Sequence, residues 1–242
     1  MDRMIYLSMS GAKATMQRQD VLANNLANAS TTGFRAELQA FRAVPVRGDG
    51  ASTRAYALET TTGYDSSAGP ISATGRPLDV AMSGNAWLAV QGLDGTEAYT
   101  RMGSLQTDAE GQLMTSGGTT VLGDGGPITI PANTTPSIAP DGTVSVRQAN
   151  GSITPVGRLK MVTPDAPLQR GDDGLFRAAA GDLPADPTAR LQDGALEGSN
   201  VNPIENMVAM IAAARQFEAQ MKMLQTAESD EKAAASLLSL NG

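Results

Sequence analysis

The chain has 242 residues, of which 41% are hydrophobic, so it is long and apolar enough to bury a core, although its 26 glycines and 13 prolines indicate many turns. Its formal net charge of -7 argues against a nucleic-acid partner, because phosphate binding needs a concentrated basic surface. Cysteine and histidine are both absent, which excludes disulfides, Cys/His zinc sites and Ser-His or Cys-His catalytic pairs, so we expect no enzyme, no cofactor and no metal.

The first 28 residues are predicted to form a helix with a heptad seam, because apolar or small side chains recur three and four apart. The seam consists of Ile5, Met9, Ala12, Met16, Ala23 and Leu26, with a gap at Gln19. Polar residues such as Lys13, Arg18 and Asp20 interrupt the apolar run that a secretory signal requires. No stretch approaches the roughly 20 apolar residues of a membrane span, so we expect no membrane insertion.

Residues 21–34 read VLANNLANASTTGF, where the first helix is predicted to end. Three asparagines recur there at one-turn spacing: Asn24, Asn25 and Asn28. Asparagine is a poor interior helix residue because its amide competes for backbone hydrogen bonds, so these amides either cap the helix or are satisfied by another chain. Gly33 can take a left-handed conformation that turns the chain, which would leave Phe34 as an anchor beyond the turn.

Residues 35–75 show no sustained period and are predicted to be an extended linker. Residues 76–190 are predicted to be an antiparallel β domain, because short apolar runs alternate with turn pairs such as Asp94-Gly95 and Asp141-Gly142. The expected strands are 78–82, 87–90, 112–115, 119–122, 128–130, 143–146 and 157–162. Trp87, the only tryptophan, is expected to anchor the β core, with a sugar-stacking platform as the alternative.

Residues 191–242 are predicted to carry the C-terminal helix, with Asn202 as N-cap, Pro203 at the first helical position and Glu205 at the third. Its seam consists of Met207, Met210, Ala214, Phe217, Met221 and Leu224. Residues 1–47 hold six basic and three acidic side chains, whereas residues 197–242 hold three and six. Two segments that pack together would show these opposite charges, and so would two solvated faces.

The predicted fold class is therefore α+β: N- and C-terminal helices that pair as a coiled coil, with a central antiparallel all-β domain. The predicted parts are residues 1–34, 35–75, 76–190 and 191–242. Two helices alone have little core, and methionine-rich seams adapt to partners, so we expect the pair to be stabilised by neighbouring molecules. The alternative is that both helices simply cover the β domain.

The two ends, MDRMIYLSMSGA with ANNLANASTTGF and SNVNPIENMVAMIAAARQFEAQMKMLQTAES, resemble the terminal signatures of the flagellar rod and hook protein family, and are most similar to its proximal rod members. The blocks at 77–82, 99–104 and 111–123 are similar to the family's β-domain motifs, so the resemblance covers nearly the whole chain. Arg215-Gln216-Phe217-Glu218 stands where the distal rod protein usually has an arginine-tyrosine-glutamate block.

The resemblance implies a structural subunit of the bacterial flagellar basal-body rod, located in the periplasm and exported without a cleaved signal peptide. It implies helical polymerisation that transmits torque, with the terminal helices as an inner layer enclosing the export channel. The implied partners are other copies of the chain, rod proteins of the FlgB, FlgC, FlgG and FliE types, and the flagellar type III export apparatus.

The residues expected to pair the helices or to contact other subunits come from both ends of the chain. They are Ile5, Met9, Met16, Leu22, Asn24, Asn25, Leu26, Asn28, Phe34, Met207, Met210, Phe217, Met221 and Leu224, with Gly33 as the turn. We expect at least one of the three asparagines to have a partner on another chain. The alternative functions are a secreted β-domain adhesin or glycan-binding protein with a helical oligomerisation stalk, and an enzyme of the paired-carboxylate type.

Overall fold

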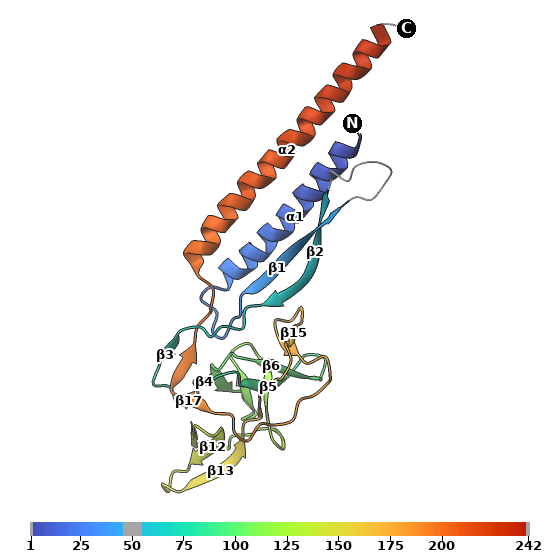
Figure 1. Ribbon diagram of the computed structural model, residues 1–242. Helices are drawn as coiled ribbons and strands as arrows, with labels where there is room; N and C mark the ends of the chain where they lie inside the picture. The colour runs from blue at the N-terminus through green and yellow to red at the C-terminus, as the bar shows by residue number, and fades with distance from the viewer. Residues whose placement is uncertain (1, 46–54, 241–242) are drawn as a thin grey trace. The chain divides into compact units, whose positions relative to one another are not determined.

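The computed structural model describes residues 2–45 and 55–240, which form two long helices and a series of short strands (Figure 1). The helices are α1 (Asp2–Ala27) and α2 (Pro203–Leu240). The strands are β1 (Glu37–Pro45), β2 (Ala55–Tyr64), β3 (Ile71–Ala73), β4 (Val80–Met82), β5 (Trp87–Gln91), β6 (Glu97–Thr100), β7 (Leu105–Thr107), β8 (Leu113–Thr115), β9 (Thr120–Gly123), β10 (Gly126–Pro127), β11 (Thr135–Ile138), β12 (Thr143–Arg147), β13 (Ile153–Arg158), β14 (Met161–Val162), β15 (Gln169–Arg170), β16 (Phe176–Arg177), β17 (Leu191–Asp193) and β18 (Ala195–Glu197).

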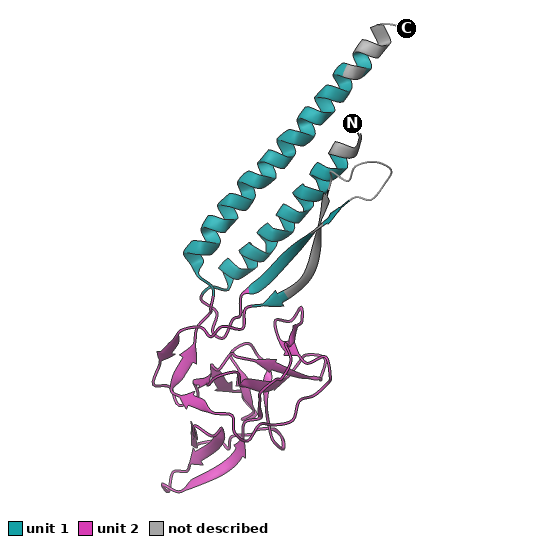
Figure 2. Ribbon diagram, viewed as in Figure 1, with its two compact units in different colours: residues 1–29, 37–64, 201–242 teal, residues 30–36, 65–200 magenta. Residues whose placement is uncertain are grey.

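These elements form two compact units, each with its own contacts (Figure 2). The helical unit consists of residues 1–29, 37–64 and 201–242, and the β unit consists of residues 30–36 and 65–200. The chain therefore enters and leaves the β unit more than once. The predicted α+β class, with paired terminal helices and a central antiparallel domain, is confirmed.

The two helices of the helical unit lie side by side and run in opposite directions (Figure 1). The first ends at Ala27, after which the Asn28 amide still donates to the Asn24 carbonyl at 3.1 Å. The second begins as predicted, because the Asn202 side-chain oxygen accepts from the amides of Ile204 at 3.1 Å and Glu205 at 3.3 Å. This is an N-cap that satisfies two otherwise unpaired donors of the first turn.

Residues predicted as an extended linker instead form a hairpin, in which β1 and β2 pair in antiparallel register with Glu37 opposite Tyr64. The hairpin belongs to the helical unit and lies along α1 (Figure 1). A two-stranded hairpin is marginal by itself. The hairpin depends on backbone pairing and on contact with α1, which are non-local, so local periodicity does not predict it. The linker prediction for 35–75 is therefore wrong, and β3 also falls inside this range.

The β unit contains antiparallel sheets, as predicted. The largest has the strand order β15-β16-β6-β5-β9-β8-β7, with β10 on β9 and β14 on β5. A three-stranded sheet has the order β11-β12-β13, and β4 and β3 pair with β17 and β18. The last two pairs show that the boundary predicted at residue 191 is wrong, because residues 191–197 belong to the β unit.

The core of the β unit gathers apolar side chains from the large sheet, from β11 and β12, and from the β4–β17 pair. It includes Val80, Met82, Leu88, Val90, Leu105, Leu113, Val121, Val144, Leu159 and Met161. Trp87 is 2% exposed and its ring centroid lies 4.7 Å from that of Phe176. The prediction that Trp87 anchors the core is confirmed, and its burial removes it as a sugar-stacking platform.

Candidate assembly surface

The buried seam of the helical unit consists of small or short polar side chains. In α1 the buried residues Ser8, Ala12 and Thr15 are spaced four and three apart, and in α2 Ala213 is 1% exposed. At Gly11 a Cβ atom would lie only 3.0 Å from the Gln220 side chain. Helices approach most closely where their side chains are small, so this seam sets the separation of α1 and α2.

Larger residues at the predicted sites line the margins of this seam. Six of them are half-buried: Ile5, Leu22, Leu26, Met210, Phe217 and Leu224. Among the helix residues whose burial is described, the fully buried ones are small or polar. Within the part of the two helices whose burial is described, little apolar area is therefore fully buried, in agreement with the thin core expected from the sequence.

Four methionines predicted for the seam lie outside it. Met9 is 55% exposed and Met16 is 57% exposed, while Met207 and Met221 are 47% and 39% exposed. The prediction that they pair α1 with α2 is therefore wrong. The cause is that large apolar residues were assigned to the seam. Ala12 is shared by the predicted and observed sets, but the other observed positions lie one residue earlier, at Ser8, Thr15, Ala213 and Gln220. These methionines remain available for contacts between subunits.

Other apolar side chains that the sequence prediction missed join them on the outer surface. Ile204, Val208 and Ile211 of α2 are 74%, 62% and 56% exposed, and Tyr6 of α1 is 57% exposed. Their spacing of four and three residues places the three α2 side chains on one face. Exposed apolar faces of this kind mark interaction sites, so the helical unit carries the candidate assembly surface.

The three asparagines have different environments. Asn25 is 4% exposed, and its amide donates to the Glu37 carbonyl at 3.0 Å while its oxygen accepts from the Glu37 N–H at 2.8 Å. Asn28, half-buried, donates to the carbonyl and the side-chain oxygen of Asn24, which is exposed. Asn25 thus joins α1 to the hairpin, and Asn24 and Asn28 bond across one turn at the helix end.

Gly33 turns the chain as predicted, and Phe34 is the predicted anchor beyond the turn, although the sequence also placed it among the possible contacts between subunits. Gly33 has a φ of 68°, and a Cβ there would collide with the Arg101 backbone, so only glycine fits this turn. Phe34 is 7% exposed, and the Arg170 guanidinium lies 4.6 Å from its ring centroid. Phe34 is therefore an anchor within the β unit, not a contact between subunits.

A buried ionic triad was missed by the sequence prediction. The Glu197 carboxylate, 1% exposed, pairs with Arg35 at 2.8 Å and with Arg101 at 2.6 Å, and both arginines are 2% exposed. Burial lowers the pKa of the Arg101 guanidinium, and the Glu197 carboxylate opposes that shift. Each charged residue stands among small or apolar neighbours in the sequence, which was the available signal. The three residues lie 66 and 96 positions apart along the chain, so no local pattern joins them.

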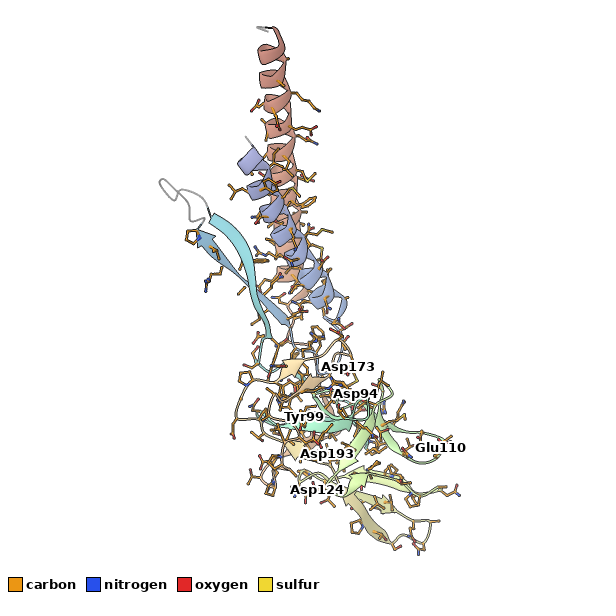
Figure 3. All side chains as sticks on the ribbon, turned by 90° about the vertical axis from the view of Figure 1, so that its right-hand side faces the viewer. Asp94, Tyr99, Glu110, Asp124, Asp173 and Asp193 are labelled. Carbon is orange, nitrogen blue, oxygen red and sulfur yellow. The ribbon has the colours of Figure 1, made fainter. Side chains whose placement is uncertain are left out.

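The other polar clusters of the β unit have structural partners. Glu97 pairs with Lys160 at 2.6 Å and accepts from the Tyr99 hydroxyl at 2.8 Å, and burial raises the pKa of Tyr99. Tyr99 therefore stays protonated at neutral pH and cannot serve as a base. Arg177 joins Asp94 to Asp173, which lie close together in Figure 3.

The sequence leads us to expect neither a metal site nor a membrane-spanning helix. Within residues 2–45 and 55–240, His, Cys, Asp and Glu side chains nowhere gather in a group of three that could hold a metal ion. In the same part of the chain, neither helix combines the length and the apolar character that a membrane crossing requires.

Three family models match successive parts of the chain. A model described as flagella basal body rod protein matches residues 5–35, which include most of α1 and the Gly33 turn. One described as flagellar hook protein FlgE/F/G D1 domain matches residues 81–146 in the β unit. One described as flagellar basal body rod FlgEFG protein C-terminal matches residues 192–237, which include Glu197 and most of α2.

Whole proteins match as well. The chain is 47% identical to the flagellar basal-body rod protein FlgF of Salmonella typhimurium and 47% identical to that of Escherichia coli, with 100% of each chain covered. It is 33% identical to the flagellar basal-body rod protein FlgG of Bacillus subtilis, over 93% of this chain and 95% of that protein. Matches of this length extend through both helices and the β unit. The chain therefore belongs to the flagellar basal-body rod protein family, with the FlgF proteins among its full-length relatives.

Proposed function

We propose that this chain is a structural subunit of the bacterial flagellar basal-body rod and that it has no catalytic activity. The observation that carries the proposal is the helical unit, whose described helix residues fully bury only small or polar side chains and leave the large apolar ones half-buried or exposed. Such a unit gains most of its stability from neighbours. The full-length similarity to FlgF proteins gives the assembly in which those neighbours are found.

The proposed mechanism is burial of the outer apolar faces on assembly. Each square ångström of apolar area removed from water contributes about 25 cal/mol, and a polymer repeats the contact at every subunit. Met9 and Met16 of α1, with Met207 and Met221 of α2, are the proposed inter-subunit contacts. Many small repeated contacts would resist twisting, which is what a shaft that transmits torque requires.

The partners and the location follow from the same proposal. The chain would assemble with its own copies and with other rod proteins such as those of the FlgG type, to which it is also similar. FlgB, FlgC and FliE types are further proposed partners, and the flagellar type III apparatus would export the chain without a cleaved signal. Within the periplasmic rod, the paired helices would form the inner layer around the export channel, and the β unit the outer layer.

Complementation of a strain lacking the gene tests the proposal. Met9→Glu combined with Met16→Glu places two charges on the exposed face of α1, and we expect swimming to be lost. The purified variant should keep the helical circular-dichroism signal of the parent, since both side chains already lie in water. A strain that swims normally with this variant would contradict the proposed contacts.

The matched control is Leu93→Glu, which also replaces an exposed apolar residue by a charge, on a turn of the β unit where Leu93 is 89% exposed. We expect this variant to restore swimming. A deletion strain that still builds filaments would overturn the rod function itself. Binding of the purified chain to a glycan array would instead support the adhesin alternative.

A further inference from the structure

Three segments of the β unit continue directly into elements of the helical unit. Residues 33–36 precede β1, residues 65–69 follow β2, and residues 197–200 precede α2. We call them the exit segments. The exit segments all belong to the β unit, and the contacts between them hold them to one another.

Glu197 binds all of these segments through its carboxylate and backbone. Its Oε1 accepts from Arg35 at 2.8 Å and from the Gly69 amide at 3.0 Å, and its carbonyl accepts from the Gly33 amide at 2.8 Å. Its Oε2 accepts from Arg101 Nε at 2.8 Å, and Arg101 also donates to the carbonyls of Met82, Gly84 and Ala86. One carboxylate thus joins the exit segments to the backbone around β4 and β5.

Asn200 makes a second set of bonds between the same segments. Its side-chain oxygen accepts from the Ala36 amide at 2.7 Å, and its side-chain nitrogen donates to the carbonyls of Asp65 and Ser67, each at 3.0 Å. Its own amide donates to the Phe34 carbonyl at 3.3 Å. An asparagine side chain carries an acceptor oxygen and a donor NH₂ group on separate atoms, so Asn200 can accept from one exit segment and donate to another.

The backbones of the exit segments are packed too closely to slide past one another. A Cβ at Gly69 would collide with the Gly198 carbonyl, and the Gly198 amide donates to the Pro70 carbonyl at 2.8 Å. Arg35 also donates to the Ser67 carbonyl at 2.6 Å. The exit segments are therefore in direct backbone contact, with the buried charges placed between them.

We propose that Glu197, Arg35, Arg101 and Asn200 form a junction lock that holds the exit segments together and opens as one local unit, separately from the sheets of the β unit. The triad is buried, so a carboxylate removed from it leaves two arginine charges without their partner, which is far more destabilising than loss of an exposed pair. Glu197 lies near the C-terminal end of the sequence, whereas both arginines lie well before it. The lock therefore closes only when distant parts of the chain have come together.

The lock has a mechanical consequence, although the inference itself does not depend on the proposed rod function. The chain crosses between the helical unit and the β unit at four places, and the exit segments stand at three of them, so force carried along β1, β2 or α2 must pass through an exit segment. Tied segments share that force and resist twisting, whereas separate linkers would bend one by one.

Amide hydrogen exchange of the full chain, followed by NMR, tests the proposal with Glu197→Gln. This substitution keeps the size of the side chain and removes its charge. We expect exchange at the amides of Gly33, Gly69 and Gly198 to become about 100-fold faster or more. The amides of Ala89 in β5 and Leu113 in β8, which donate to the carbonyls of Lys160 and Ile128 at 2.9 Å, should keep their parent rates.

The matched control is Glu97→Gln, which removes the carboxylate of the other enclosed ion pair of the β unit, with Lys160. It should leave the exit amides at their parent rates. Unchanged exchange at Gly33 and Gly69 in Glu197→Gln would overturn the proposal, and so would an equal increase at Ala89, because the segments would then open only with the whole unit.

Asn200→Ala is a second variant that tests the same proposal if Glu197→Gln fails to fold. This variant retains the triad and removes only the bonds to Ala36, Asp65 and Ser67. We expect faster exchange at Ala36 with no change at Leu113. Parent-like exchange at Ala36 would contradict the lock.

Discussion

Asn25 shows how one polar side chain can decide the position of an element. Its amide makes the same pair of bonds with Glu37 that a neighbouring β-strand residue would make, at 2.8 and 3.0 Å. The Glu37 backbone begins β1, so the end of α1 fixes where the hairpin starts. Asn24, one residue earlier, is exposed, and its side-chain oxygen accepts from Asn28 of the same helix end and not from the described residues of the hairpin.

Replacing Asn25 should therefore destabilise the helical unit. In Asn25→Ala both Glu37 backbone groups lose their partner in a part-buried site, and we expect the free energy of unfolding to fall by about 1–3 kcal/mol. Urea denaturation followed by circular dichroism measures this change. Asn24→Ala is the control and should stay within about 0.5 kcal/mol of the parent. Equal effects of the two substitutions would refute the bridging role of Asn25.

Asp186 gives a pH-dependent effect in the β unit. Hydrogen bonds from the Thr163 hydroxyl at 2.6 Å and from Thr188 lower the pKa of its carboxyl from 3.8 to about 2. Because the folded-state pKa is depressed, these bonds stabilise the fold above pH 3.8 and their contribution is lost as the pH falls toward 2.

Thr163→Val should raise the pKa of Asp186 toward 3.8, because it removes the first of these donors while keeping the side-chain shape. A carboxyl NMR titration between about pH 1 and pH 5, roughly one unit beyond either end of the shift, records this midpoint. Thr163→Ser retains the hydroxyl and should titrate like the parent. An unchanged midpoint in Thr163→Val would show that Thr163 does not cause the shift.

At the scale of elements, the helix pair is assembled through small residues. Ala12 and Ala213 are buried, whereas Met9 and Met207 are exposed. The pair thus keeps its large apolar side chains for outer contacts. The hairpin β1-β2 also belongs to this unit and adds a layer beside α1 (Figure 1).

A larger side chain in the seam should push the helices apart. We expect Ala213→Leu to lower the free energy of unfolding of the helical unit by about 1–3 kcal/mol, the usual cost of overpacking. Ala212→Leu adds the same atoms one residue away, where the helix is exposed, and should change stability little. Thermal unfolding of the two variants compares them directly. If Ala213→Leu were as stable as Ala212→Leu, the observed seam would be wrong.

At the scale of the whole molecule, the two units differ in how much apolar surface they bury. The β unit has a continuous core in which Leu88, Val90 and Leu113 are fully buried. The helical unit has no buried helix residue of that size among those described. We infer that the β unit is the independently stable part of the monomer and that the helical unit depends on its neighbours.

Limited digestion of the purified monomer by proteinase K should therefore cut both helices before the β unit. Mass spectrometry of the first products should show fragments that lack parts of α1 and α2 and retain β4 to β16. The reason is that local opening is easiest where few apolar contacts are lost. Digestion of the β unit at the same rate as the helices would contradict this difference. In assembled rods the helices should become resistant.

The sequence by itself determined the α+β class, both helices, the Asn202 cap, the Gly33 turn, the buried Trp87 and the family. The structural features follow from local causes, because caps, glycine conformation and apolar periodicity act within a few residues. The family followed from the resemblance of whole motifs at both ends and in the β domain. Only the tertiary structure decided the hairpin, the small-residue seam and the triad of Arg35, Arg101 and Glu197. The physical reason is that strand pairing, helix separation and burial of charge depend on groups far apart in the chain, whose partners no local pattern names.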